Sequence, residues 1–186
     1  KEKGVNMNFD KAMYSINKGL WGTSVGGKET LSSKGLLPEE AWPTQVSKSG
    51  TEEISLGFEK GELQSVNDKV FAHPVEAIQY LQSIAGPYGI GRDIHVGDTI
   101  IGIKGRVGFE AAAPMLILKA HHALEKHVLT KWQLQWKDTL AQFYGNWMHE
   151  GQILDPVMRD IEAFLQNSQQ NVSGKVFIQL MPYRFQ

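Results

Sequence analysis

The segment GTSVGGKE, residues 22 to 29, has the glycine and lysine spacing of a phosphate-binding loop. In such a loop, Ser or Thr follows the Gly-Lys pair and places a hydroxyl on a magnesium ion. Here that position is Glu29, and the segment follows the polar SINKG rather than a buried strand. Gly35 and Pro38 would also interrupt the helix that should come next. We therefore interpret the segment as a turn with permissive glycines and not as a nucleotide site.

Six histidines raise the question of a metal site. His122 and Glu125 could share a helical face, with His127 nearby, but no second segment offers a matching pair of ligands. The chain has no cysteine, which excludes a thiolate zinc site, a disulfide and a cysteine nucleophile. The sequence therefore predicts no metal site, and the lack of cysteine is consistent with a reducing cytoplasm.

Aromatic residues recur at helical spacing between residues 132 and 147. Such rings can stack on bases, but a nucleic-acid site also needs a basic groove, and Lys131 and Lys137 are offset here by Asp138 and Glu150. The chain has 19 basic and 20 acidic residues, so its net charge favours neither nucleic acid nor an anionic membrane as a partner. We interpret the aromatics as a packing stripe, directed toward the core or toward another subunit. They are Trp132, Trp136, Phe143, Tyr144 and Trp147.

Ser15 and Ser24 are the remaining residues whose side chains could take part in catalysis or binding. Neither lies in a nucleophile elbow or has the His and Asp order of a hydrolase triad, so the sequence does not support covalent catalysis. Hydroxyls on a glycine-rich segment suit the recognition of a small polar ligand. Residue chemistry alone therefore predicts a possible binding segment and no more.

The elements that must hold these residues indicate an α+β fold in one domain, residues 1–186. Residues 1–50 show no sustained helical or strand period, and we predict a long irregular arm there. A largely antiparallel sheet packed with three to four helices should follow, and the longest apolar runs are too short to span a membrane. Helices are predicted at 75–86, 114–129, 131–148 and 155–167, and strands at 52–66, 89–110 and 174–185.

Three separated motifs carry a family resemblance. They are SINKGLWGTS, GIGRDIHVGDTIIGIKGRVGFE and VSGKVFIQLMPYRF. In this order and at these intervals they resemble the second, synthetase domain of argininosuccinate synthase. The resemblance implies a cytoplasmic, homotetrameric ligase that joins citrulline to aspartate. ATP with Mg²⁺ would be converted to AMP and pyrophosphate through a citrullyl-adenylate, by positioning and charge stabilisation rather than by a nucleophilic side chain.

The resemblance also implies that two parts of the family's proteins are missing from these 186 residues. The family binds ATP with an amino-terminal domain that carries an SGGxDS-type loop, and its aspartate-binding residues lie in that domain. Neither this domain nor the carboxy-terminal tail that embraces neighbouring subunits is found in the 186 residues. The chain also begins KEKGVNMNF without an initiator Met, so we expect part of a longer protein that is inactive alone.

The citrulline pocket can be compared position by position. The family places two serines nine residues apart on citrulline, and Ser15 and Ser24 match them in spacing and context. Three further positions depart from the family, which commonly has Glu at the position of Gly26, and Glu and Tyr at those of Gly97 and Phe109. The serines are thus retained, while two carboxylates and a phenol are absent.

These departures bear on the substrate, because a partly buried ammonium needs acceptors or a counter-charge. Our hypothesis is that the substrate is either citrulline or a citrulline with an acylated α-amine. Lys28, Lys104 and Arg106 would then be candidates to meet a carboxylate on the acyl group. Alternatively, Asp98 or Glu29 supplies the missing charge to free citrulline.

A function of another class also fits the sequence. The chain could be a non-catalytic oligomerisation domain in which the aromatic-rich helix and the arm mediate assembly and the pocket is degenerate. Ser15 and Ser24 distinguish the two hypotheses, because a decayed pocket has no reason to retain both hydroxyls.

Overall fold

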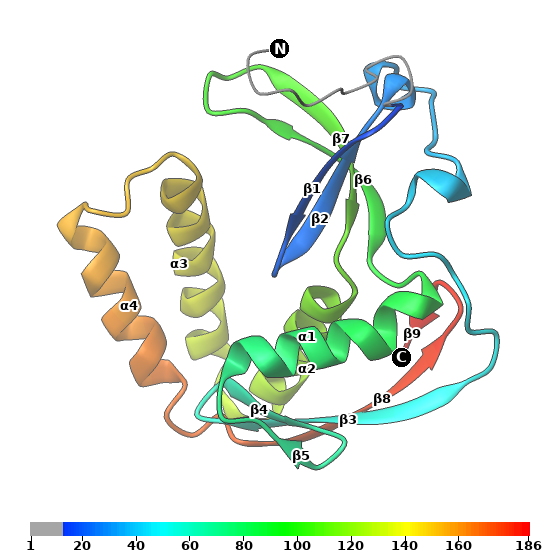
Figure 1. The fold of residues 1–186 in the computed structure, drawn as a ribbon. Helices are drawn as coiled ribbons and strands as arrows, with labels where there is room; N and C mark the ends of the chain where they lie inside the picture. Colours follow the sequence, from blue (N-terminus) through cyan, green and yellow to red (C-terminus); the bar gives the residue numbers. More distant parts are fainter. Residues whose placement is uncertain (1–12) are drawn as a thin grey trace.

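The computed structural model describes residues 13–186, and its described part contains two antiparallel sheets and four α-helices (Figure 1). The predicted α+β class is confirmed. The sheets lie at opposite ends of the molecule, with helices α1 (Pro74–Ala85) and α2 (Ala112–Val128) on the five-stranded one. Helices α3 (Lys131–His149) and α4 (Pro156–Ser168) stand together at one side.

The four-stranded sheet has the order β1-β2-β7-β6. Its strands are β1 (Ser15–Gly19), β2 (Gly22–Gly26), β7 (Lys104–Glu110) and β6 (Arg92–Asp98). The prediction of an irregular arm over 1–50 was therefore wrong for residues 15–26, which form a hairpin. Beyond β2 the chain does run irregularly to residue 51, except for the short 3₁₀ helices η2 (Lys28–Leu31) and η3 (Glu39–Ala41).

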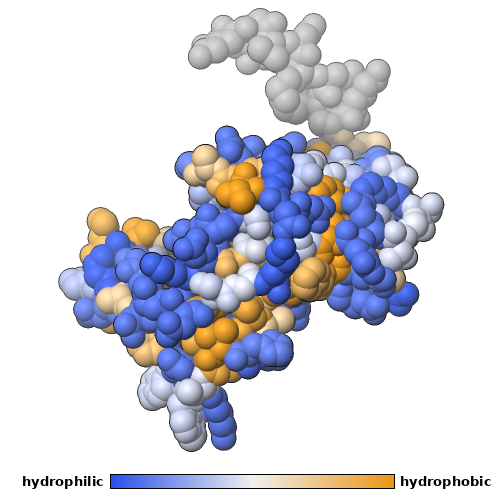
Figure 2. Space-filling model, turned by 90° about the horizontal axis from the view of Figure 1, so that it is seen from below, coloured by the Kyte–Doolittle hydropathy of each residue, from blue (hydrophilic) through white to orange (hydrophobic). Residues whose placement is uncertain are grey.

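The five-stranded sheet has the order β5-β4-β3-β8-β9. Its strands are β5 (Lys69–Val70), β4 (Glu62–Val66), β3 (Glu52–Glu59), β8 (Gly174–Met181) and β9 (Arg184–Phe185). The predicted hairpin around residues 59–61 is confirmed, and its turn uses left-handed backbone at Lys60 (φ 50°) and Gly61 (φ 83°). The outer face of this sheet shows apolar patches separated by polar residues (Figure 2).

The helix starts follow from local capping. The His73 imidazole accepts a hydrogen bond from the backbone N–H of Val75 at 3.2 Å and caps α1, and Pro74 occupies the first turn. Asp155 caps α4 in the same way, through the N–H of Val157 at 3.0 Å. The four predicted helices are confirmed to within a few residues at each end.

The main core lies between the five-stranded sheet and helices α1 and α2. Leu56, Leu81, Leu116 and Leu180 from these elements are completely buried. The four-stranded sheet has a much smaller core of its own, made of Val25, Leu37 and Ala41. A short 3₁₀ helix, η4 (Gly86–Tyr88), connects α1 to β6.

A buried ion pair joins α3 to α2. Glu125 is fully buried, and its carboxylate accepts hydrogen bonds from Lys137 at 2.6 Å and from the Gln169 amide at 2.9 Å. Burial alone would lower the pKa of Lys137, but the hydrogen bonds to Glu125 and Asp138 outweigh it and raise that pKa. Glu125 thus has structural partners, and Nδ1 of His122 lies 3.5 Å from the same carboxylate.

The aromatic stripe of α3 does not belong to this core. No residue of α3 is buried, and Trp132, Trp136 and Phe143 are 62%, 58% and 54% exposed. Of the two directions predicted for the stripe, the structure rules out the core of this chain. No helix within residues 13–186 has the length and apolar character needed to cross a membrane.

Candidate functional site

One face of the four-stranded sheet gathers the residues singled out in the sequence. Ser24 pairs with Asn17 on β1 and with Phe109 on β7, and Phe109 pairs with Asp93 on β6. Because side chains alternate along a strand, every second residue from these positions shares their face. We call this surface the serine face. It consists of Ser15, Asn17, Ser24, Gly26, Asp93, His95, Gly97, Gly105, Val107 and Phe109.

The opposite face of the sheet packs against the segment between β2 and β3. Val25 packs there with Leu37 and Ala41. The Arg92 guanidinium lies 2.8 Å from the Glu39 carboxylate and 3.5 Å from that of Glu110. The segment between β2 and β3 is thereby fixed to this side, so that, within residues 13–186, this segment does not cover the serine face.

The two glycines of the serine face differ in their surroundings. A methyl group built at Gly26 would find only the Ser15 Cβ, at 4.0 Å, so the space above Gly26 is open. At Gly97 the same methyl group would lie 2.5 Å from Nε2 of His95. The imidazole of His95 therefore lies across Gly97 and occupies the room that a side chain there would need.

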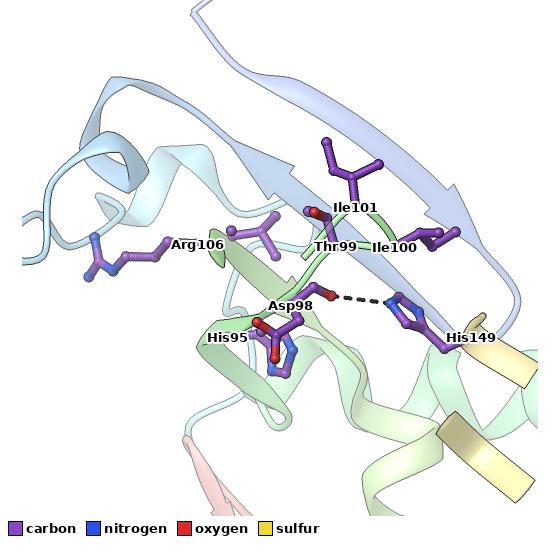
Figure 3. Close-up of a pocket in the computed structure, with 10 residues that line it drawn as sticks. His95, Asp98, Thr99, Ile100, Ile101, Arg106 and His149 are labelled. Atoms are coloured by element: carbon purple, nitrogen blue, oxygen red, sulfur yellow. Dashed lines mark hydrogen bonds between the residues drawn. The ribbon is translucent and has the colours of Figure 1, made fainter. Parts of the chain in front are cut away.

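Two hollows border the serine face and meet at His95. The larger, of about 630 Å³, is walled mainly by Gly97, Ile100, Ile101 and Val107 (Figure 3). The smaller, of about 400 Å³, lies over Phe109, and its other lining residues are Trp21, Gly91, Asp93, His95, Ala111, Pro114, Met115 and Leu118. Hollows of this size match those that hold small ligands.

The larger hollow is closed on one side by α3. His149 at the end of α3 places its Nε2 3.2 Å from the backbone oxygen of Asp98 (Figure 3). The turn between β6 and β7 is held by the N–H of Thr99, which donates to the Ile103 carbonyl at 2.9 Å. These contacts bring a helix far along the chain to the edge of the serine face.

Comparison with known proteins identifies the domain. Residues 14–184 match the family model described as the arginosuccinate synthase C-terminal domain. This chain belongs to the argininosuccinate synthase family. Among its relatives, the argininosuccinate synthase of Methanocaldococcus jannaschii is 36% identical over 183 residues, covering 97% of this chain and 46% of the relative.

Bacterial members of the family are similar to the same extent. The argininosuccinate synthase of Xanthomonas campestris is 34% identical and that of Dictyoglomus thermophilum 36% identical, covering 96% and 94% of this chain. These matches take in 46% and 44% of the two relatives. The chain thus spans less than half the length of the argininosuccinate synthases that it matches.

The structure places five of the six predicted site residues together. Ser15, Ser24, Gly26, Gly97 and Phe109 all lie on the serine face, although they come from four strands. Ser24 and Phe109 are direct cross-strand partners, as are Ser15 and Gly26. Their common placement is what a shared ligand would require.

Arg106 is the exception among the predicted residues. Its guanidinium lies on the opposite face and donates to the backbone carbonyls of Glu29, at 3.1 Å, Ser32 and Gly35, at 2.7 Å. In Figure 3 its side chain points away from the hollow. Arg106 does line the larger hollow, but its guanidinium holds the loop after β2, and its role in substrate binding stays a prediction.

Of the two alternative sources of charge, Asp98 lines the larger hollow. The Asp98 carboxylate is paired with Lys104 at 2.8 Å, and both alternate with Gly97 and Gly105 along their strands. Burial, followed by the carboxylates of Glu29 and Glu40, raises the pKa of Tyr14, which packs on the Val25 side of the sheet. A methyl group built at Gly27 would lie 2.7 Å from the Tyr14 ring and 2.9 Å from Oε2 of Glu29, so the Glu29 carboxylate lies near Tyr14 on that side.

His95 and His149 were missed by sequence reasoning. His95 could have been found from alternation, because it lies two residues before Gly97 in a predicted strand and must share its face. His149 gave no such signal, since its position depends on how α3 packs. Both imidazoles border the larger hollow.

The segment GTSVGGKE does not have the geometry of a phosphate-binding loop. GTSVGGKE forms strand β2 followed by a 3₁₀ helix, without the strand-to-helix turn that cradles phosphate. Within residues 13–186, no group of three or more His, Cys, Asp or Glu side chains could hold a metal ion.

Proposed function

We propose that this chain is the substrate-binding domain of an ATP-dependent carbon–nitrogen ligase in arginine biosynthesis. The full-length enzyme condenses the ureido group of a citrulline with the amine of aspartate. The ureido oxygen attacks the α-phosphate of ATP and pyrophosphate leaves; the aspartate amine then displaces AMP and gives argininosuccinate. Membership of the argininosuccinate synthase family over residues 14–184 supports this assignment.

The observation that carries the proposal is the joint placement of Ser15 and Ser24 on an accessible face. β1 is exposed along its length and Ser24 is partly exposed, and neither hydroxyl faces the packed side of the sheet. Each hydroxyl can donate one hydrogen bond and accept others, which suits the polar groups of citrulline. Their role is to bind and orient the substrate, so that a reaction driven by ATP takes place at a fixed ureido group.

A second candidate function rests on a different observation. The exposed aromatics of α3 are an apolar surface of the kind that subunit interfaces cover. They favour an assembly role for this domain, and they are compatible with a catalytic homotetramer in the cytoplasm, which is the form we propose. A domain used for assembly alone would leave the serine face without a ligand.

The test is pyrophosphate release by the full-length protein. With ATP, Mg²⁺ and aspartate present, release should depend on a citrulline-type substrate and should form argininosuccinate or its substituted counterpart. Dependence on both amino substrates supports the ligase. The absence of turnover with every ureido compound, together with no heat of binding in calorimetry, would establish the assembly domain instead.

A further inference from the structure

We propose that the serine face takes a citrulline whose α-amino group is acylated, and that the larger hollow holds the acyl group. This inference rests on the proposed ligase function of the same face. His95 is the residue that we assign to substrate choice, because its imidazole stands where the two hollows meet.

The first argument is the character of the larger hollow. Its lining combines Gly97, Ile100, Ile101, Gly105 and Val107, which offer hydrocarbon or backbone to a ligand, with the polar residues His95, Asp98, Thr99, Arg106 and His149. The hollow, of about 630 Å³, is far larger than an amino group needs. An acyl chain would fill this space and remove apolar surface from water, which is favourable.

The second argument is the lack of a counter-charge for an ammonium. An unpaired charge moved from water into apolar surroundings is costly unless a partner compensates it. Among the described residues, the Asp98 carboxylate at the rim of this hollow is already paired with Lys104 at 2.8 Å, and Glu29 lies on the opposite side of the sheet. An acylated nitrogen is a neutral amide, so it avoids this cost.

The third argument concerns Asp93, the carboxylate that does lie on the serine face. It pairs with Phe109 across the strands and borders the smaller hollow, away from Gly97. One of its oxygens already accepts the N–H of Ile94 at 2.7 Å. A free α-ammonium directed at Asp93 would leave the larger hollow empty, so Asp93 is the rival binding site that the test must exclude.

His95 connects the two parts of such a substrate. A neutral imidazole carries one N–H, which can donate to the carbonyl oxygen of an amide. The ring reaches its position only because Gly97 has no side chain, since a Cβ there would lie 2.5 Å from Nε2. His95 and Gly97 therefore act as a pair, with the glycine making room for the imidazole.

The far wall limits the acyl group to a short chain. His149 of α3 is anchored to the Asp98 carbonyl at 3.2 Å, and the turn after β6 is closed by the Thr99–Ile103 hydrogen bonds. Of the three cations predicted to meet an acyl carboxylate, Lys104 is paired with Asp98, Arg106 donates to the loop after β2, and Lys28 does not line this hollow. The hollow therefore favours a short aliphatic acyl group, with the two imidazoles as its polar contacts.

The experiment compares the kcat/KM of the full-length protein for L-citrulline, α-N-acetyl-L-citrulline and α-N-succinyl-L-citrulline, through pyrophosphate release. We expect α-N-acetyl-L-citrulline to be preferred over L-citrulline by about tenfold or more, because the ammonium of free citrulline would lack a counter-charge in the larger hollow. It should also be preferred over the succinyl compound, whose acyl group brings a second carboxylate. His95→Ala should lower the acylated-to-free ratio about three- to tenfold, the effect of one hydrogen bond to a neutral group. His95→Gln, which retains an N–H donor, should recover part of it, and Gly97→Ala should act like His95→Ala.

Controls separate specificity from folding. His127→Ala, on an exposed part of α2, should leave the ratio unchanged. Asp93→Asn should not raise the acylated-to-free ratio, as it would if Asp93 bound the ammonium of free citrulline. Circular dichroism checks that each variant is folded. Preference for free citrulline, or a ratio that His95→Ala does not move, overturns the proposal while the ligase function stands. If no ureido compound releases pyrophosphate, the proposed function fails as well.

Discussion

The two sheets of this chain are built in different ways. The five-stranded sheet is covered by α1 and α2, and its core includes completely buried residues from strands and helices alike. The four-stranded sheet packs one face on a core of only three buried residues and leaves the other face open. The first region supplies most of the burial, and the second carries the groups that suit a ligand.

The same contrast appears in the charged pairs. Glu125 and Lys137, between α2 and α3, have exposed side-chain fractions of 0% and 15%. Lys104 and Asp98, at the end of the β6–β7 hairpin, are 69% and 60% exposed. Removing one partner of a buried pair leaves the other charge unpaired and out of contact with water, whereas removing one partner of an exposed pair does not. The variants below test whether the two regions differ in this way in their contribution to stability.

The largest effect on stability is expected in the main core. Leu116→Ala removes a fully buried side chain from α2 and should lower the free energy of unfolding by about 4 kcal/mol. Leu37→Ala, in the small core under the serine face, should cost about 2 kcal/mol because its surroundings can relax. Urea unfolding measures both, and equal losses would contradict the contrast between the two regions.

The buried ion pair comes next. Lys137→Met leaves the Glu125 carboxylate buried without its cation and should cost about 3 kcal/mol. Lys104→Met is the matched control, and should cost less than about 1 kcal/mol because the pair is exposed. If the two substitutions are equivalent in urea unfolding, the buried network does not hold α3 to α2.

A substitution of Arg106 tests whether this residue stabilises the loop after β2 or binds substrate. Arg106→Ala should lower the free energy of unfolding by about 2 kcal/mol, because three carbonyls lose a charged donor. It should also speed proteolytic cleavage within residues 28–35, while the ratio of kcat/KM values for acylated and free citrulline stays the same. A change in that ratio would indicate that Arg106 takes part in substrate binding.

The smallest effect is a dependence of stability on pH. A hydrogen bond from Lys48 lowers the pKa of Glu52, opposed by burial and helped by the Tyr88 hydroxyl at 3.0 Å. Because the folded-state pKa lies below the unfolded value, the stabilisation is present above the usual range near 4.5 and is lost as the pH falls through the folded pKa. Since Glu52 is partly exposed, we expect about 0.5 kcal/mol at neutral pH.

Glu52→Gln should remove this contribution, and Tyr88→Phe part of it. The free energies of unfolding of wild type and Glu52→Gln would then converge as the pH is lowered from 7 to 3. A difference that persists unchanged at pH 3 would contradict the assignment to Glu52.

Much of the fold could be predicted because local signals agreed with it. His73-Pro74 and Asp155-Pro156 mark helix starts by capping chemistry that needs no tertiary information. The β1–β2 hairpin could not be predicted, because its serine face carries polar side chains and glycine and Val25 is its one hydrophobic residue in the core. Without alternating apolar residues, a strand has no sequence signal.

The site was predicted in part for a similar reason. Ser15 and Ser24 were found through family motifs, while the face they share follows from strand register alone. Alternation also explains why Arg106 and Phe109 face opposite sides of the sheet, since they lie three residues apart on one strand. The position of His149 depends on the packing of α3, which no local pattern encodes.

The most direct test of the account is the affinity of the serine face for its ligand. Isothermal titration of the full-length protein with citrulline and α-N-acetyl-L-citrulline should be compared between wild type and Ser15→Ala/Ser24→Ala. The Kd of the better ligand should rise by about tenfold or more, since two hydrogen bonds are lost, while the control Ser33→Ala/Ser49→Ala, at exposed loop positions, binds as wild type does. An unchanged Kd in the Ser15→Ala/Ser24→Ala protein would contradict the assignment of this face as the substrate site.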